Sequence, residues 1–557
     1  MKKILYHTLL ISLFFTTFNC NKNYLKEQPK AIINADNLYV DKAGFEAGLW
    51  GLYNLFRLER SSTDNSTNNM TITAAIIGVD NAYCPYPSGS APERIFSEFG
   101  TMLNPTSGYI RDLFAYLYQI VNSANTIINR ADNPAIAWTE KEKNSIVAEA
   151  RLFRAWAYRH LTFLWGDVPL SLEEASGNNI KTDWERTPVP EVRKQMEEDW
   201  IFAEANLPDV PNLEGKVTKV IAQHYLAELY LTIGNNAKAR EKAMAVIANS
   251  NYSIITNRYG VQSSQPGSAF MDMFIDKNAN RSEGNKEALW VIQNEYASLG
   301  GYNNIMRRWW VNRYNTIRAG GKTPITYSIE NGGRGIGRFG ATKYALALYE
   351  ANDERGSAYA WRHYWIMNNP ASLPTGSNQN ATCTNPGYTG GKLGDTVKLS
   401  INCDEPLPNS TTVQNWPNTR KWDWSHSDDI QITSNYNDQV YLRLAETYLI
   451  LAEAQYNLGD VAGAATTINV LRNRAHATPV TAADVNIDLI LDERSRELFS
   501  EEHRRYTLIR LHKWFERTKK YNKYSGVRIT LRDTLLPIPQ SVIDANLTKP
   551  FPQNAGY

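Results

Sequence analysis

Aromatic rings interspersed with polar side chains give one stretch of the chain a clear binding chemistry. It contains Tyr296, Tyr302, Arg307, Trp309 and Trp310. A glycan presents hydroxyl edges and weakly apolar C–H faces, so a glycan site needs flat rings flanked by groups that replace the hydrogen bonds of water. Neighbouring residues of an extended strand point to opposite faces, so we expect at most one of the two tryptophans to stack on sugar. Packing in the core is the alternative for each ring.

A second candidate site lies in the polar stretch 60–107. This stretch is rich in Ser, Thr, Asn, Pro and Gly and shows no sustained helical period, and it holds Asp80, Asn81, Tyr83 and Tyr86. Loops of this length in folded domains commonly carry function. We therefore predict ligand-binding residues here, with the alternative that Asp80 and Asn81 are turn residues.

Sequence patterns for catalysis and for cofactors are weak. Residues 335–340 match the G-x-G-x-x-G pattern of dinucleotide sites, but no apolar strand precedes them and no acidic residue follows about 20 positions later. The eight histidines have no metal-ligand spacing, and no G-x-S-x-G or P-loop motif is present. We predict no catalytic residues, no metal ligands and no cofactor; the sequence does not decide whether calcium binds in the loop-rich part.

Charged residues are dense near the C-terminus, where three- and four-residue spacings suit ion pairs along a helix. They include Glu493, Arg494, Glu497, Glu501, Glu502, Arg504 and Arg505. We interpret them as one face of a long solvated helix rather than as catalytic acids. The net charge of the whole chain is only +2, which argues against a nucleic-acid partner.

The first 20 residues have the features of a secretory signal. Lys2 and Lys3 precede an apolar run that ends at Cys20, and this run is too short to span a membrane. A cysteine at this boundary, followed by polar residues, predicts a lipoprotein whose Cys20 is lipidated. An ordinary cleaved signal is the alternative, because Thr17 to Asn19 lack the usual residues before a lipidated cysteine.

Three cysteines follow Cys20, in a compartment where disulfides persist. Cys383 and Cys403 enclose a loop rich in Gly, Asn and Pro that has little apolar content with which to order itself, so we predict that they form a disulfide. Cys84 is then a lone thiol, either a small buried residue or part of a binding pocket.

Two similar helical hairpins supply the scaffold that must position these residues. Residues 436–475 predict two helices joined at Gly459 and Asp460, with apolar and alanine residues at three- and four-residue steps. Residues 227–246 match this segment at a shift of 225 residues, which places Gly234 on Gly459. Such a pair of small-residue helices around a glycine turn is typical of a tetratricopeptide-like unit, which needs neighbours to bury its apolar face.

The remaining pattern predicts a mainly α protein with an irregular half. Helices are expected at 44–57, 108–130, 191–206 and from a capping box at Thr139 and Glu142 to about Gly166. Helical periodicity is lost between 253 and 435. We divide the chain into a signal with its lipidation cysteine (1–20), an N-terminal helical region (21–252), a loop-rich variable region (253–435), and a C-terminal hairpin with charged helix and tail (436–557), integrated into one fold from residue 21.

Seven segments in register resemble the SusD/RagB family of Bacteroidetes surface lipoproteins. They comprise the lipoprotein start, AEARLFRAWAYRHLTFLWGDVPL, KVTKVIAQHYLAELYLTIG, YLRLAETYLILAEAQYNLG, INVLRNRA, DERSRELFSEEHRRYTLIR, and the ending LPIP with QNAGY. The resemblance spans nearly the whole chain. It implies a scaffold of tetratricopeptide-like hairpins that carries a loop-rich, strand-poor binding half.

The resemblance also implies a function. The resemblance implies a non-catalytic binding protein that is anchored in the outer membrane and faces the cell exterior. Such a protein captures glycans and acts with a SusC-like TonB-dependent transporter. It implies that the regions around Asp80 to Tyr86 and Tyr302 to Trp310 correspond roughly to places where ligands bind in such proteins.

Three other readings remain at this point. A peptide-binding subunit resembling RagB differs only in ligand. A secreted glycoside hydrolase would need two carboxyl groups about 5 Å or about 6.5–9.5 Å apart in one cleft. A pure scaffold would use the hairpin grooves to bind partner peptides, although tryptophans far from those grooves argue against it.

Overall fold

The structure is a computed structural model, and it describes most of the chain after the N-terminal segment. The described residues are 34–61, 71–85, 94–177, 180–296, 298, 301, 304–400, 403–406, 413–426, 429–432 and 434–557. The predicted signal, Cys20, Tyr86 and Tyr302 lie outside these ranges. Predictions about those four features are therefore not addressed by the fold.

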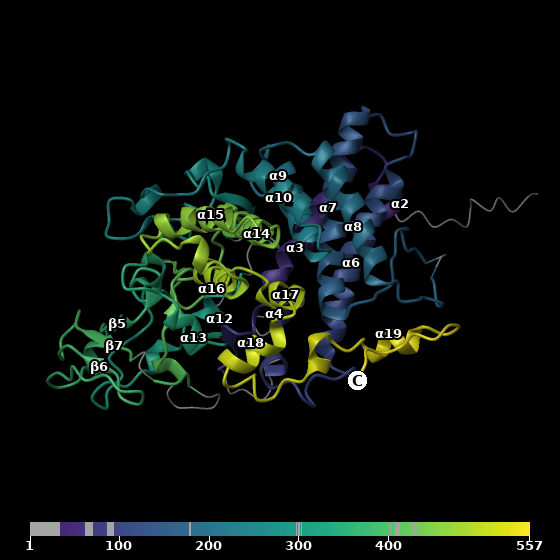
Figure 1. Ribbon diagram of the computed structural model, residues 1–557. Helices are drawn as coiled ribbons and strands as arrows, with labels where there is room; N and C mark the ends of the chain where they lie inside the picture. The colour runs from purple at the N-terminus through teal and green to yellow at the C-terminus, as the bar shows by residue number, and fades with distance from the viewer. Residues whose placement is uncertain are drawn as a thin grey trace, which may run out of the picture.

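Four helices pack side by side at one end of the molecule (Figure 1). They are α3 (Lys42–Arg57), α6 (Gly108–Arg130), α7 (Glu140–Trp165) and α8 (Val189–Asn206). The predicted capping box opens α7, because Thr139 and Glu142 each accept the backbone N–H of the other. At Gly166 the backbone φ of +74° ends this helix, as expected. These helices confirm the predicted mainly α class.

Two hairpins continue the array, and they pack on each other. The first consists of α9 (Lys219–Thr232) and α10 (Asn236–Ile247), and the second of α14 (Leu444–Asn457) and α15 (Val461–Arg474). Helix α14 packs against both α10 and α9. The two turn glycines, Gly234 and Gly459, have φ values of +77° and +81°. The repeat inferred from the 225-residue shift is thus also a pair of neighbours in space, with each hairpin covering the apolar face of the other.

The start of the second hairpin differs from the prediction. Residues 439–443, which we expected to be helical, form strand β9 (Gln439–Arg443), paired antiparallel with β2 (Ala288–Ile292). All five residues of each strand are buried. Leu442, which the predicted helical range 436–475 included, therefore pairs with Trp290 of β2. Pairing with this distant strand satisfies the backbone of a buried segment.

The other half of the molecule is built from loops, short helices and short strand pairs (Figure 1). Its short helices are α11 (Ala269–Asp272), α12 (Met306–Trp310) and α13 (Lys343–Ala347). Strand β1 (Ala82–Tyr83) pairs with β3 (Gly340–Ala341), β4 (Trp361–Arg362) with β8 (Asn418–Thr419), and β7 (Thr396–Lys398) with both β5 (Tyr364–Ile366) and β6 (Gly387–Tyr388). These named pairs are all antiparallel. The parallel unit that a dinucleotide site needs is therefore not formed around residues 335–340.

The charged C-terminal segment is broken rather than continuous. It forms α16 (Ile487–Leu498), α17 (Arg504–Arg510) and α18 (Trp514–Tyr521) instead of one long helix. Ser500 and His512 have positive φ at the two breaks. The chain turns at these points so that all three helices pack against α4 (Thr73–Ile76), the second hairpin or the loop-rich half.

The ends of the described chain lie at the helical side. Helix α2 (Ala35–Leu38) precedes α3, and α5 (Ile95–Glu98) lies before α6; α19 (Gln540–Ala545) runs along the base of α6 (Figure 1). The main apolar core draws residues from α3 at one end of the sequence to Phe551 at the other. Within the described part of the chain, no helix combines the length and the apolarity that crossing a bilayer requires.

Candidate functional site

Asp80 is not placed to meet a ligand. Its carboxylate is fully buried and accepts hydrogen bonds from Arg504 at 2.7 and 2.9 Å and from Arg517 at 2.9 Å. Burial alone would raise the pKa of Asp80, but the two guanidinium groups hold it below its ordinary value. We correct the prediction for this residue: Asp80 joins the start of the chain to α17 and α18.

Its neighbours Asn81 and Tyr83 are also in the interior. The Asn81 amide donates to Ser495 Oγ at 3.1 Å, and the Tyr83 hydroxyl donates to the Pro406 carbonyl at 2.8 Å. Both side chains are at most 3% exposed. The stretch from α4 to β1 is thus a buried connection, which does not fit the predicted ligand role. Asp80 and Asn81 lie in a bend of this stretch, in agreement with the alternative that they are turn residues.

The paired tryptophans are likewise buried. Trp309 and Trp310 lie on α12, not on an extended strand, and both are at most 1% exposed. Trp310 packs edge-on against Phe339 and Phe499. A helical turn points consecutive side chains in different directions within the interior, so both rings are covered. The core packing that we gave as the alternative for each ring holds for both, and the ligand role predicted for Trp309 and Trp310 is corrected.

Arg307, on the same helix, is held by the backbone. Its guanidinium group donates to the carbonyls of Trp424 and Ile432. Burial lowers its pKa to about 10.

The other tryptophans of the loop-rich half are also buried, and these are Trp361, Trp365, Trp416, Trp422 and Trp424. The argument that exposed tryptophans disfavour a pure scaffold is therefore withdrawn.

Among the predicted ligand-binding residues that the structure describes, Tyr296 has a large exposed surface, with 53% of the residue accessible. Its ring lies 4.7 Å from that of Tyr436, which stacks on His426 at 3.5 Å. We call Tyr296, Tyr436 and His426 the ring cluster. It offers the flat aromatic surface that the sequence led us to expect, but built from a different set of residues.

The cysteines behave as predicted. Cys383 and Cys403 form a disulfide. Cys84 is buried and takes no part in it. The disulfide closes a 20-residue segment of the loop-rich half, where few apolar side chains are available to order the chain.

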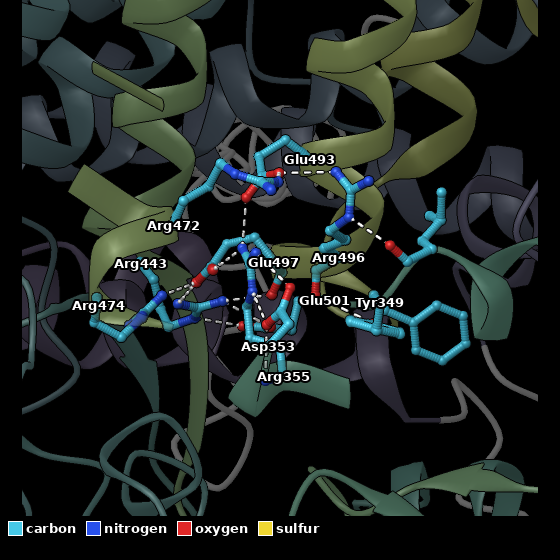
Figure 2. A network of polar contacts seen from close by, with 12 residues as sticks. Tyr349, Asp353, Arg355, Arg443, Arg472, Arg474, Glu493, Arg496, Glu497 and Glu501 are labelled. Atoms are coloured by element: carbon cyan, nitrogen blue, oxygen red, sulfur yellow. Dashed lines mark hydrogen bonds and ion pairs between the residues drawn. The ribbon is translucent and has the colours of Figure 1, made fainter. Parts of the chain in front are cut away.

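The C-terminal charges form a buried ion network, which Figure 2 shows. Glu497 accepts from Arg355, Arg443 and Arg474 at 2.5–3.1 Å, and all four side chains are at most 4% exposed. Burial would raise the pKa of Glu497, but these three charges hold it well below its ordinary value. The prediction of a solvated face was wrong, because loop segments from the other half cover α16.

This network joins elements that are distant in sequence. Arg443 leaves β9 and reaches Glu287, beside β2, at 2.6 Å and Glu501 at 2.7 Å. Arg355 comes from the loop-rich half, and Lys421 from the same half contacts Glu501. Every carboxylate here is paired with a cation, so the cluster holds the two halves together and has no unpaired acid available for catalysis.

One group of described side chains has a donor set that metals use. Glu59, His160 and His503 are buried, with ligand atoms within 4.8 Å of one another. However, Arg159 donates to His503 Nδ1 at 3.0 Å, and since a guanidinium only donates, the proton of this neutral imidazole is on Nε2, which donates to Glu59. A cation would have to displace that proton beside a guanidinium charge. We interpret the group as a hydrogen-bonded chain.

Described residues of the loop-rich half outline a polar cleft of about 590 Å³. We call it the cleft. Its lining includes Arg258, Asp272, Tyr359, Arg362, Arg420, Asp423, Trp424, Ser425 and Asn437. Ser425 precedes His426 and Asn437 follows Tyr436 in sequence, so the ring cluster adjoins the cleft.

Ion pairs fix the cleft walls. Asp423 accepts from Arg362 at 2.5 Å and from Arg420 at 2.9 Å, and Arg258 pairs with Asp272 at 2.7 Å. The ring of Tyr359 is 41% exposed beside them. Such walls combine an aromatic face with oriented donors and acceptors, which is the chemistry that sugars require.

Four cleft residues hold buried polar atoms without a hydrogen-bond partner. These atoms are Asp272 Oδ1, Arg362 Nε, Asp423 Oδ1 and Asn437 Oδ1. Buried polar groups in proteins are nearly always satisfied, and an exception calls for water or a ligand. Sequence reasoning missed these residues because their positions are scattered between 258 and 437 and share no motif.

Two family models match the chain. One, described as the SusD family, matches residues 253–557, and one described as "Starch-binding associating with outer membrane" matches residues 88–231. A SusD-like protein P25 from Formosa agariphila is 24% identical over 90% of this chain and 88% of that protein. A SusD-like protein from Bacteroides ovatus is 25% identical over 50% of this chain and 48% of its own length.

Solved structures share the fold. A SusD homolog from Bacteroides thetaiotaomicron has a TM-score of 0.70 at 18% identity and covers 94% of this chain and 98% of its own. NanU from B. fragilis has a TM-score of 0.68 at 20% identity, with coverages of 95% and 100%. A protein titled laminarin binding SusD-like protein has a TM-score of 0.62 at 20% identity, with coverages of 92% and 99%.

Proposed function

The chain belongs to the SusD family, and from this premise we propose that it is a surface-exposed lipoprotein that binds oligo- or polysaccharides without altering them. It captures the glycan outside the cell and delivers it to a SusC-like TonB-dependent transporter. Outer-membrane association agrees with the description of the second matching family model. The named ligand of one structural relative, laminarin, is a glycan, which supports this class of ligand.

The observation that carries the proposal is a cleft whose wall sets the ion-paired groups of Asp423, Arg362 and Arg420 beside the exposed ring of Tyr359. Sugar hydroxyls donate and accept at once, so they complement a wall of carboxylate, amide and guanidinium groups. The ring of Tyr359 offers a stacking surface. The binding surface is open, and we expect weak affinity for one short oligosaccharide and tighter binding of long chains through several contacts.

The test is calorimetric titration of residues 21–557 with a panel of purified polysaccharides, laminarin included, and with peptide pools. Saturable binding of a glycan and none of the peptides supports the proposal. Binding of the peptides instead would establish the peptide-uptake alternative. Release of reducing ends from a bound polysaccharide would establish a hydrolase instead.

Variants localise the site. Tyr359→Ala and Tyr296→Ala each remove an exposed ring, and we expect each to weaken glycan binding about three- to tenfold. Trp50→Ala is the matched control, since Trp50 is 46% exposed on α3 and is not among the residues that line the cleft. An equal loss in the control, or none in either tyrosine variant, would show that the glycan binds elsewhere.

A further inference from the structure

A strongly basic segment lies beside the cleft. Between residues 307 and 338 the chain carries seven arginine and lysine side chains and one carboxylate, Glu330. The net charge of the entire chain is only +2. The positive charges of this segment therefore far outnumber the carboxylates that the segment itself could pair with them.

The fold doubles the segment back on itself. Asn312 and Ile336 form a bridge, the N–H of Ile336 donates to the Arg308 carbonyl at 2.8 Å, and the N–H of Phe339 donates to the Trp309 carbonyl at 2.9 Å. Two basic runs that are about 20 residues apart in sequence thus lie side by side. Arg313 of the first run is exposed and Arg334 of the second is half-buried, and both flank the bridge between Asn312 and Ile336.

Tyr327 and Arg334 both lie next to residues that contact Tyr314, the neighbour of Arg313. The Tyr314 hydroxyl accepts from the backbone N–H of Ser328 at 3.3 Å and donates to the Gly333 carbonyl at 2.6 Å. Burial raises the pKa of Tyr327, while the charges of Arg313 and Arg334 act to lower it. The ring of Tyr327 packs edge-on against Tyr314, which stacks on Trp365 at 4.2 Å. We call Arg313, Tyr327 and Arg334 the arginine ledge.

The ledge arginines lack carboxylate partners. Arg313 is exposed, and half-buried Arg334 donates to the Gln431 carbonyl at 3.1 Å. Neither forms an ion pair with a described carboxylate, in contrast to the cleft arginines Arg258 and Arg362. Charge in the cleft is thus neutralised internally, whereas charge on the ledge is available to a ligand.

The ledge borders the cleft. Ile329 and Glu330, which line the cleft, lie on the short loop between Tyr327 and Arg334. Gly332 on this loop lies against Asp423 and Arg362 of the cleft wall. A chain of sugars that fills the cleft would therefore extend within reach of the ledge.

We propose that the arginine ledge binds anionic substituents, carboxylate or sulfate, of the glycan whose neighbouring sugars occupy the cleft. This assigns the ligand to the class of acidic polysaccharides, and it rests on the proposed glycan-binding function. Guanidinium groups bind both kinds of oxyanion through paired N–H donors. The hydroxyl of Tyr327, on the same part of the surface, can add a further donor.

The experiment compares acidic polysaccharides with neutral forms of the same backbone. Residues 21–557 are titrated calorimetrically with polygalacturonate and its carboxyl-reduced form, with κ-carrageenan and its desulfated form, and with laminarin, at 50 and 300 mM NaCl. We expect at least one acidic form to bind at least tenfold tighter than its neutral form, with a preference that shrinks at high salt. The two acidic arms distinguish carboxylate from sulfate.

The variant Arg313→Gln/Arg334→Gln tests the location. We expect it to lose the preference for the acidic form while binding the neutral form as the wild type does. Arg240→Gln, which removes an exposed cation from α10, is the matched control and should keep the preference. Circular dichroism and thermal melting confirm that each variant is folded.

Three results would be decisive against the ledge. Equal binding of acidic and neutral forms, or binding of laminarin alone, overturns the inference but leaves the glycan-binding function standing. A preference that survives in the double variant overturns the ledge as its source. Failure of every polysaccharide, laminarin included, together with binding of the peptide pools would overturn the proposed function itself, and the inference with it.

Discussion

Buried charge pairs dominate this protein at the level of single residues. Asp80, Glu228 and Glu497 are each held by guanidinium groups in the interior. Replacing a buried ion pair as a unit can be neutral, but removing one partner leaves an uncompensated charge. The free energy of unfolding should therefore depend on individual carboxylates. On a solvated helix face, the same carboxylates could be replaced with little effect.

Glu497→Gln tests this dependence. Loss of the carboxylate leaves Arg355, Arg443 and Arg474 with excess positive charge in a buried site, and we expect the free energy of unfolding to fall by about 3–5 kcal/mol. The measurement is chemical denaturation followed by tryptophan fluorescence. Glu516→Gln, at an exposed pair with Lys513, is the control and should change stability by less than about 1 kcal/mol. Similar effects of the two substitutions would contradict the buried network.

Acid should destabilise the fold, and His224 contributes to this. Burial lowers the pKa of His224 from 6.5 to about 3. A pKa that is lower in the folded state means that the stabilisation is complete above pH 6.5 and is lost as the pH falls from 6.5 toward 3, since the unfolded state binds the proton more readily. We expect His224→Gln, which keeps a partner for Thr447, to show a smaller drop in unfolding free energy between pH 7 and pH 4 than the wild type. Parallel pH profiles would disprove the assignment.

The helices of the two hairpins pack as the sequence repeat predicts, and the turn of each hairpin requires glycine. Gly234 and Gly459 adopt left-handed backbone conformations that a side chain disfavours. The predicted helices around them are present. The errors occurred where an apolar or charged segment could satisfy its groups only with distant partners, as in β9 and in the break between α16 and α17.

Gly459→Ala tests the turn of the second hairpin. With φ at +81° and nothing within 4 Å of an added Cβ, strain of the backbone alone should cost about 1–2 kcal/mol of stability. Gly51→Ala is matched to it, because Gly51 also has open space but lies within α3, where alanine is favoured. Thermal unfolding should show a lower midpoint for the first variant and an equal or higher midpoint for the second. A stable Gly459→Ala protein would count against the turn geometry.

At the scale of the whole molecule, an array of helices and hairpins supports a loop-rich half (Figure 1). That half carries the cleft, the ring cluster and the arginine ledge. The proposed function also needs this body to be tethered outside the cell. The tether depends on residues before 34, where the sequence predicts a signal that ends at a lipidated Cys20.

Cys20→Ser tests the tether. If Cys20 carries lipid, the wild-type protein should incorporate an alkyne-labelled fatty acid, fractionate with membranes and be cleaved by protease added to intact cells. The variant should lose the label and the membrane association. A wild-type protein that is secreted without label would support the ordinary cleaved signal instead.

The sequence by itself determined the family, the mainly α class, the hairpin repeat, the capping box of α7 and the Cys383–Cys403 disulfide, because these depend on local spacing or on motifs in fixed order. The tertiary structure decided which aromatic and charged groups are exposed. Burial depends on what covers a side chain, and here loops from residues 350–356 and 418–425 cover α16, while Trp309 and Trp310 turn inward on a short helix. The cleft and the ledge likewise exist only because segments far apart in sequence meet. A whole-chain charge of +2 conceals a basic segment, and only the fold decides that Arg307 is buried while Arg313 is exposed.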